Sequence, residues 1–207
     1  MAHARILVLG THNRKKGAEL VELLAGLALE VKTLADFSIA TVVDEDGDSF
    51  AANARLKATN YAKTIGAWVL GEDSGLAVDA LGGAPGIYSA RFAGPQASDE
   101  QNNARLLTEL ATTPLALRTA HYVCQLALSD PSGTVRAECG GKCHGRIRFE
   151  AAGESGFGYD PLFEVIEYHR TFGQLGDRVK SALSHRARGI EKLLPLLPTI
   201  NIGLPLD

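Results

Sequence analysis

The chain of 207 residues lacks the features that mark membrane-spanning and secreted proteins. No stretch approaches the roughly 18 consecutive apolar residues of a membrane helix, and the apolar run at residues 5–10 is too short for a signal peptide. The three cysteines are an odd number without a secretory context, so reduced thiols are expected. These absences predict a cytoplasmic protein with no membrane partner.

The chain also lacks a large excess of charge of either sign, because the net charge is only −3. The chain has no basic field of the kind that attracts DNA or RNA, so no nucleic-acid partner is expected and an anionic ligand must be held by local clusters. Apolar residues make up 45% of the chain, enough for a sizeable core. No repeat and no linker divides it, so a single domain is predicted over residues 1–207.

The first third of the chain alternates strand and helix signals. The expected order is a strand at 5–10, a helix at 15–26, a strand at 30–37, a helix capped by Asp48 or Ser49, and a strand at 67–72. This order predicts an α/β sheet. Ligands bind such sheets beyond the carboxyl ends of strands, where the last strand would deliver Glu72 and Asp73.

The remainder predicts a helix, a hairpin and a final helix. Ser98 and Gln101 match a capping box that opens a helix ending near Thr112. Strand-like runs at 117–130 and 133–141 are joined by Ser-Asp-Pro-Ser-Gly, a hairpin signal. The hairpin could extend the sheet or form a second lobe. Apolar residues at helical spacing then predict a helix over 184–197, with Ser184 as its N-cap.

A cationic loop, Thr-His-Asn-Arg-Lys-Lys at 11–16, separates the first strand from its helix. Such a turn aims backbone N–H groups and the positive end of the helix dipole at its surroundings, which makes it a natural anion site. The alternative is a solvent-exposed basic first turn. Lysine in a first turn opposes the helix dipole, however, so Lys15 and Lys16 need a reason to be there.

An acidic loop with Asp44 and Glu45 precedes the second helix, on which Asn53 and Lys57 share one face. Acidic loops can hold Mg²⁺, a hard cation that prefers oxygen ligands and shares itself with substrate phosphates. On this segment alone, a solvated acidic cap of the helix is the more common structure.

Glu72 and Asp73, followed directly by Ser74, could supply a metal ligand and a general base. The alternative is a structural pair of acids that caps the following turn. Cationic phosphate-binding residues and acidic metal-binding residues at the ends of two strands together describe a nucleotide–Mg²⁺ site.

Two later clusters carry aromatic and donor groups. The glycine-rich loop at 153–163 contains Phe157, Gly158, Tyr159 and Asp160, on which a flat base can stack, although aromatics of such turns often pack in the core. The segment at 180–189 offers Lys180, His185 and Arg186, donors that suit a phosphate or a carbonyl oxygen.

The thiols carry less weight. Cys139, Cys143 and His144 look like zinc ligands, but a structural zinc site needs four ligands. A cysteine nucleophile is not supported either, because the cysteines fall in strand-like or glycine-rich segments.

Together these motifs resemble the inosine/xanthosine triphosphate pyrophosphatase family. The resemblance spans residues 6–197 and rests on "THNRKK", "DEDGDSFAANARLKA", "EDSGLAVDALGGAPGIYSARFAG", "GFGYDPLF" and "KSALSHR". It implies an elongated, mixed, twisted sheet flanked by helices, two lobes with the active-site cleft between them, and a homodimer. It also implies Mg²⁺-dependent hydrolysis of ITP, dITP and XTP to the monophosphate and pyrophosphate.

The resemblance assigns roles by position. Asp73 would be the proton acceptor and a metal ligand, Asp44 a second ligand, and Glu45 and Glu72 further candidates. Substrate would be bound by Thr11, His12, Asn13, Arg14, Lys15, Lys16, Ser74, Phe157, Gly158, Tyr159, Asp160, Lys180, His185 and Arg186.

Three positions depart from the family pattern. Ala52 replaces a glutamate, Asp44 replaces a longer glutamate, and Arg178-Val179 precede Lys180 where acids are common. These departures bear on the metal ligands and on the preferred substrate. They leave two alternatives, a Maf-like nucleotide pyrophosphatase with another base preference and an inactive nucleotide-binding sensor.

Overall fold

The computed structural model describes residues 5–37, 42–200 and 202. Within these ranges seven strands form one mixed sheet in the order β2-β1-β3-β4-β5-β6-β7. They are β1 Ile6–Gly10, β2 Glu30–Thr33, β3 Trp68–Val78, β4 Thr119–Ser129, β5 Val135–Ile147, β6 Phe163–Val165 and β7 Arg170–Thr171. Strand β1 runs parallel to β2 and β3, whereas β6 is antiparallel to β5 and β7.

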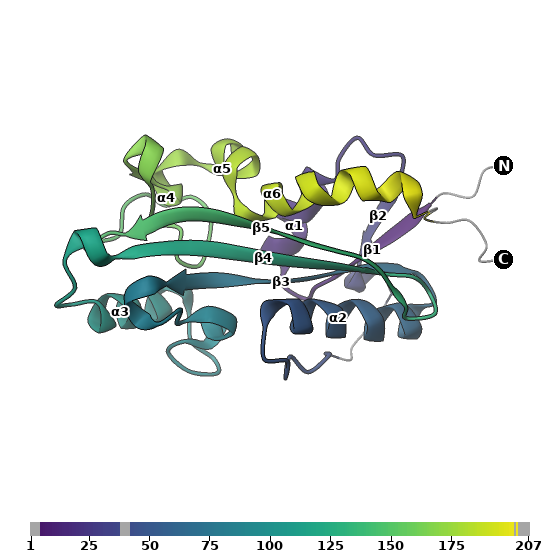
Figure 1. Ribbon diagram of the computed structural model, residues 1–207, viewed down its shortest axis with the longest axis horizontal. Helices are drawn as coiled ribbons and strands as arrows, with labels where there is room; N and C mark the ends of the chain where they lie inside the picture. Colours follow the sequence, from purple (N-terminus) through teal and green to yellow (C-terminus); the bar gives the residue numbers. More distant parts are fainter. Residues whose placement is uncertain (1–4, 38–41, 201, 203–207) are drawn as a thin grey trace. The chain divides into compact units, whose positions relative to one another are not determined.

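Six α-helices of the described ranges flank this sheet (Figure 1). They are α1 Arg14–Leu23, α2 Phe50–Ile65, α3 Asp99–Glu109, α4 Phe172–Leu175, α5 Asp177–Leu183 and α6 His185–Leu193. The predicted mixed α/β fold is confirmed. None of these helices combines the length and the apolar character that a membrane crossing requires.

The chain divides into two compact units built from interleaved segments. The first comprises Met1–Asp73, Cys124–Gly141 and Arg188–Asp207, and the second comprises Ser74–Val123 and Lys142–Ala187. Strands β3, β4 and β5 and helix α6 each contribute residues to both. The boundary on β3 falls between Asp73 and Ser74, so two neighbouring candidate residues belong to different units.

The core of the first unit follows from the alternation of side chains along a strand that is buried on both faces. Leu7 and Leu9 of β1 pack in one cluster with Leu20 of α1, whereas Val8 packs in another with Tyr61 of α2. Helices α1 and α2 therefore cover opposite faces of the sheet, as Figure 1 shows.

A third small cluster brings α2 close to β3. Ala54 and Ala58 of α2 pack against Ala127 of β4, and all three are nearly inaccessible. A Cβ atom at Gly71 of β3 would lie 2.2 Å from the backbone oxygen of Ala54. Small residues at this contact let the helix approach the strand, which brings its polar side chains within reach of the strand's acids.

The second unit has one main core cluster. Leu76 and Val78 of β3 pack with Leu106 of α3 and with Tyr122 and Phe163. The predicted capping box of α3 is present, since Ser98 N–H donates to Gln101 Oε1 (2.8 Å) and Gln101 N–H donates to Ser98 Oγ (3.3 Å).

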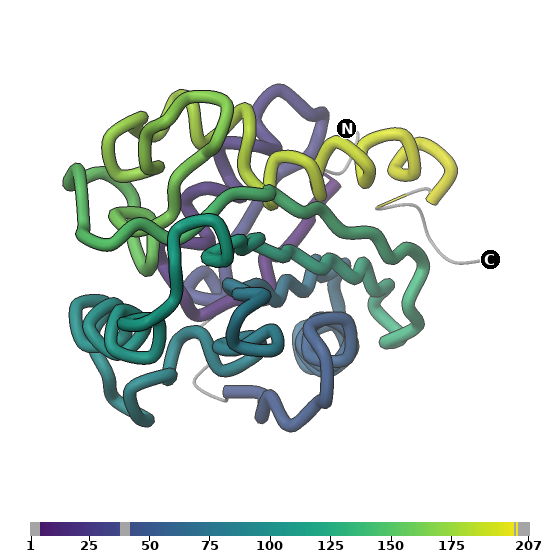
Figure 2. The backbone as a smooth tube through the Cα atoms, turned by 60° about the vertical axis from the view of Figure 1, so that its left-hand side comes forward, coloured from purple at the N-terminus to yellow at the C-terminus, as the bar shows by residue number. Residues whose placement is uncertain are grey.

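The hairpin between β4 and β5 is also as predicted, and Figure 2 follows the backbone through its two long strands. Its turn is held by Asp130, whose Oδ1 accepts from the backbone N–H groups of Ser132 (2.9 Å) and Thr134 (3.1 Å). Strand β5 extends to Ile147, beyond the predicted end at 141. Both strands belong to the seven-stranded sheet, so the hairpin extends it.

Two predicted boundaries were wrong. Strand β2 stops at Thr33, because the Asp36 carboxylate accepts from the Thr33 N–H (2.7 Å) and starts the 3₁₀ segment Leu34–Phe37. Strand β3 continues through Val78, so Glu72 and Asp73 lie inside the strand and not at its carboxyl end. The buried side chains of Leu76 and Val78 keep the strand on the core beyond the acids.

Candidate functional site

Glu72 and Asp73 are fully buried neighbours on β3 that contact different helices. Adjacent residues of a strand point to opposite faces of the sheet. Accordingly, Asp73 contacts Lys57 and Asn53 of α2, whereas Glu72 contacts Lys16 of α1. The two acids of the motif therefore belong to two separate polar clusters on opposite faces of the sheet.

The Asp73 carboxylate is held by two donors from one face of α2, as the spacing of Asn53 and Lys57 predicts. Lys57 Nζ donates to Oδ1 at 3.0 Å, and Asn53 Nδ2 donates to Oδ2 at 3.3 Å. Asn53 in turn accepts the Gly47 N–H through Oδ1 (2.9 Å), which ties the acidic loop to the helix. Both oxygens of Asp73 are thus oriented by groups that are themselves fixed.

The environment of Asp73 also sets its proton affinity. Burial raises the pKa of Asp73 above its ordinary value, against the opposing charges of Lys57 and Lys16. Burial alone would favour a neutral amine at Lys57, but the nearby carboxylates of Asp73, Glu72 and Glu45 outweigh it and raise the pKa of Lys57. Lys57 therefore stays charged beside an acid whose basicity is increased, which suits a proton acceptor.

The acidic loop supplies one further carboxylate to this cluster. Glu45 Oε2 lies 3.3 Å from Lys57 Nζ, so Glu45 and Asp73 flank the same ammonium group. Asp44 is exposed. Across the described ranges, no three His, Cys, Asp or Glu side chains converge in a way that could hold a metal ion.

Glu72 forms the second cluster. Its Oε2 lies 3.4 Å from Lys16 Nζ, and its Oε1 accepts a long contact of 3.8 Å from the Cys124 thiol. This contact explains Lys16 in the first turn of α1, because its charge neutralises the Glu72 carboxylate, which has no solvent exposure.

The cationic loop differs from its predicted role in one respect. Asn13 caps α1, with Oδ1 accepting from the backbone N–H groups of Lys15 (3.0 Å) and Lys16 (3.1 Å). The Asn13 amide oxygen thus occupies two of the donors expected to face an anion. Thr11 Oγ1 accepts from the Asn13 N–H at 3.2 Å.

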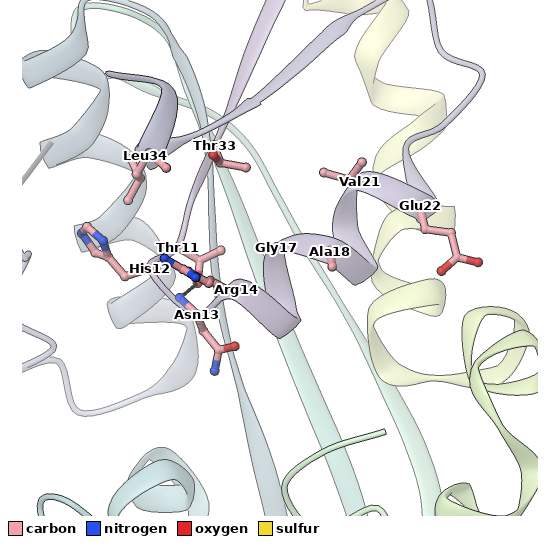
Figure 3. A pocket seen from close by; sticks show the side chains of 11 residues that line it. Thr11, His12, Asn13, Arg14, Gly17, Ala18, Val21, Glu22, Thr33 and Leu34 are labelled. Atoms are coloured by element: carbon pink, nitrogen blue, oxygen red, sulfur yellow. Dashed lines mark hydrogen bonds between the residues drawn. The ribbon is translucent and has the colours of Figure 1, made fainter. Parts of the chain in front are cut away.

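A pocket of about 690 Å³ lies beside this loop in the first unit (Figure 3). Thr11, His12, Asn13 and Arg14 line one part of it. The rest of the wall comes from α1 and from Thr33, Leu34 and Ala35. Four of the six residues predicted to bind phosphate therefore share one cavity.

In the second unit Asp160 is the centre of a buried network. Its Oδ2 accepts from Lys180 Nζ (2.5 Å) and from the Phe157 N–H (2.9 Å), and its Oδ1 accepts from the Tyr122 hydroxyl (3.1 Å). The loop leaves room for this carboxylate because Gly156 has φ +78° and carries no Cβ, which would lie 2.1 Å from Asp160 Oδ2.

Two of the predicted donors lie over the ring of Phe157. Lys180 Nζ and the Arg186 guanidinium carbon lie 4.2 Å and 5.5 Å from the centre of its half-buried ring. Arg186 also donates to Ser74 Oγ at 2.6 Å, which connects another predicted residue to the group. The structure thus brings together Ser74, Phe157, Asp160, Lys180 and Arg186 within the second unit.

Three residues of this region are placed differently from the expectation or were not foreseen. The Tyr159 ring lies in the core and its hydroxyl donates to the Ser89 carbonyl (2.8 Å), so it offers no free face for stacking. His185 is buried and stacks on Tyr122, with ring centres 4.7 Å apart and planes at 12°. Tyr122 was missed, because in the sequence it reads as one more apolar position of β4.

Of the three thiols, Cys124 contacts Glu72 of the second cluster. Burial raises the pKa of the Cys139 thiol to about 11, so it is a poor nucleophile at neutral pH. Cys143 is buried in the core of the second unit, and its partners there do not form a zinc site among the residues described.

Known proteins are similar to this chain in sequence and in fold. A dITP/XTP pyrophosphatase of Rhodopirellula baltica is 52% identical over 191 residues, covering 92% of each chain. A dITP/XTP pyrophosphatase of Desulforamulus reducens is 45% identical, covering 95% of this chain and 97% of the relative. The structure of a HAM1 protein from Coxiella burnetii is 36% identical with a TM-score of 0.85, covering 94% of this chain and 98% of that one.

The model of the Ham1 family matches residues 7–196. This range includes every polar cluster described above. The match runs from the second residue of β1 to beyond the end of α6. With this coverage and these identities, the chain belongs to the Ham1 family.

Proposed function

We propose that this protein is a nucleoside-triphosphate pyrophosphatase that hydrolyses ITP, dITP and XTP to the monophosphate and pyrophosphate, with Mg²⁺, and so removes non-standard purines from the nucleotide pool. The names of the relatives support this class of substrate. The observation that carries the proposal is Asp73, a buried carboxylate oriented by Lys57 and Asn53.

Asp73 is suited to accept a proton from the attacking water. Its raised pKa increases its basicity, and the two donors from α2 fix the direction of its lone pairs. The bond to be broken joins the α- and β-phosphates, with water adding to phosphorus and pyrophosphate leaving. Charged side chains at Lys57 and Lys16, and the residues of the 11–16 loop, would offset the charge of the triphosphate.

The donor set of the first unit fits Mg²⁺. Carboxylate oxygens are its preferred protein ligands, and it is commonly held by one or two carboxylates together with substrate phosphates and water. Asp73 and Glu45, which flank the same ammonium group at 3.0 and 3.3 Å, would hold it, and Asp44 of the same loop is a further candidate, whereas Glu72 faces the other side of the sheet with Lys16. When bound, the ion would supply charge neutralisation and polarise a phosphoryl oxygen.

The second unit is suited to recognise the base. Hypoxanthine and xanthine carry a 6-oxo group, whereas adenine carries a 6-amino group that cannot accept a hydrogen bond. Lys180, His185 and Arg186 are donor side chains, and Lys180 and Arg186 are oriented by their hydrogen bonds to Asp160 and Ser74. Buried donors left without an acceptor can discriminate by roughly 10⁴-fold.

The decisive experiment is pyrophosphate release from ITP, XTP, dITP, ATP, GTP and CTP, each with Mg²⁺ and with EDTA. Release confined to ITP, dITP and XTP, and abolished by EDTA, would establish both the reaction and the base preference. Release mainly from CTP or another pyrimidine would indicate a Maf-like enzyme. Tight ITP binding without pyrophosphate release would indicate the inactive nucleotide-binding sensor, the alternative suggested by the alanine at position 52.

Two further expectations stay predictions. The family resemblance implies a homodimer and a cytoplasmic location. Sedimentation of the purified protein and its fractionation from cells would test them.

A further inference from the structure

Tyr122 connects two side chains that the proposed function assigns to the base. Its ring stacks on the His185 imidazole at 4.7 Å with nearly parallel planes, and its hydroxyl donates to Asp160 Oδ1 at 3.1 Å. It comes from β4, whereas Asp160 and His185 come from a loop and from the start of α6. A single side chain therefore fixes groups from two other elements.

The hydroxyl has a specific task at Asp160. Lys180 and the Phe157 N–H both donate to Oδ2, whereas Tyr122 donates to Oδ1 and so helps to fix the plane of the carboxylate. That plane decides where Lys180 lies, and Lys180 Nζ is 4.2 Å from the centre of the Phe157 ring. The position of Lys180 over the Phe157 ring thus depends on Tyr122 through Asp160.

Packing alone would not require tyrosine here. Phe163 and Phe172 fill the same cluster and stack on each other without any polar atom. A buried hydroxyl costs free energy unless it is hydrogen-bonded, and this one is bonded to a charged group. Burial and the nearby Asp160 carboxylate raise the pKa of Tyr122 well above its ordinary value, so the hydroxyl remains a donor.

We propose that Tyr122 is a positioning residue for base recognition, which orients the His185 imidazole through its ring and the Asp160–Lys180 pair through its hydroxyl. The inference rests on the proposed role of these side chains in binding the purine. It assigns Tyr122 no contact with the substrate and no part in the hydrolysis itself.

Two variants separate the two contacts. Tyr122→Phe keeps the stacked ring and removes the hydroxyl, whereas Tyr122→Leu removes both. The matched control is Phe172→Leu, which deletes an aromatic ring from the same core cluster, where that ring stacks on Phe163 at 5.6 Å. For each protein, kcat and KM are measured with ITP, and the inhibition constant is measured with inorganic triphosphate.

Tyr122→Phe is expected to raise KM for ITP about ten-fold while kcat stays within about two-fold, the size of one lost hydrogen bond to a charged group. Tyr122→Leu should raise KM further, because stacking adds to the loss. The inhibition constant of inorganic triphosphate, which has no base, should not change. Phe172→Leu should lower the melting temperature and leave KM unchanged.

The inference is overturned if Tyr122→Phe leaves KM unchanged, or if the inhibition constant of triphosphate rises together with KM. An equal rise of KM in Phe172→Leu would also overturn it, since it would reduce Tyr122 to a packing role. The proposed function is decided separately by the wild-type nucleotide panel. Should that panel show no turnover, calorimetric affinities for ITP and triphosphate with the same variants still decide the role of Tyr122.

Discussion

Each unit buries an aspartate against a lysine, yet the two pairs have different surroundings. Asp73 pairs with Lys57 at 3.0 Å, and Lys57 is shared with Glu45 while Glu72 lies next to Asp73 on the strand. Asp160 pairs with Lys180 at 2.5 Å and receives two further donors, from Tyr122 and from the Phe157 backbone. In the first pair two carboxylates share one ammonium group, whereas in the second pair three donors share one carboxylate.

We interpret this difference as one between the proton acceptor proposed above and a carboxylate that fixes its neighbours. An acid whose ammonium partner is shared with other carboxylates keeps the capacity to take up a proton or a cation. An acid whose oxygens accept three hydrogen bonds has little remaining capacity, and its effect is to fix its donors in place. The comparison predicts that neutralising the two aspartates will damage different properties of the protein.

The largest effect is expected for turnover in Asp73→Asn. Asparagine keeps the shape, and its one amide oxygen can still accept from Lys57, but its amide nitrogen cannot accept from Asn53 or take the proton of water. Pyrophosphate release from ITP should fall by about 10²–10⁴-fold, the usual contribution of a general base. The matched control is Asp46→Asn, which neutralises an exposed acid of the acidic loop. Activity near that of wild type in Asp73→Asn would contradict the assignment.

The next effect concerns stability. Asp160→Asn breaks a buried pair and leaves Lys180 without its charged partner, which typically costs about 3–5 kcal/mol of the free energy of unfolding. Asp73→Asn should cost clearly less, because Lys57 retains Glu45 and because burial already disfavours the charge on Asp73. Denaturant unfolding of both variants tests the order. Equal losses would remove the distinction between the two pairs.

A third effect is the pH dependence of stability. Burial raises the pKa of Asp73 in the folded state. A group with a raised pKa contributes stability that is fully present below its unfolded pKa and is lost as pH rises through its folded pKa, by about 1.4 kcal/mol for each unit of pKa difference. Asp73→Asn should therefore gain stability relative to wild type between acid and neutral pH. If Asp73→Asn instead loses stability relative to wild type as the pH rises, the attraction of Lys57 for the Asp73 carboxylate outweighs the effect of burial.

Much of this comparison could be read from the sequence. The spacing of Asn53 and Lys57 predicts that both reach the same point, and they do, at Asp73. The donors Lys180 and Arg186 and the loop residues Phe157 and Asp160 were also predicted to be functional, and the fold gathers them.

Other features depend on tertiary contacts that local patterns do not contain. The glycine after Ser74 suggests a turn, but β3 continues because the buried Leu76 and Val78 hold it on the core. Tyr122 has no motif at all, since its role depends on partners 38 residues away and more.

The smallest predicted effect sharpens the description of the second unit as a site of fixed donors. Helix α3 holds the peptide of Gly158 from both sides, with Asp99 Oδ2 accepting its N–H (2.8 Å) and Asn103 Nδ2 donating to its carbonyl (2.9 Å). Asn103→Ala removes one neutral hydrogen bond, worth about 1 kcal/mol, and should raise KM for ITP about three- to five-fold with kcat unchanged.

Thr108→Ala is the control for Asn103→Ala, because Thr108 lies on the same helix and its hydroxyl bonds only the Ala104 carbonyl one turn earlier. If both variants leave KM unchanged, the loop of Phe157 and Asp160 is held well enough by Tyr122 and Lys180 alone. If Asn103→Ala lowers kcat instead of raising KM, the loop takes part in the hydrolytic step, and the division between a reactive first unit and a base-binding second unit fails.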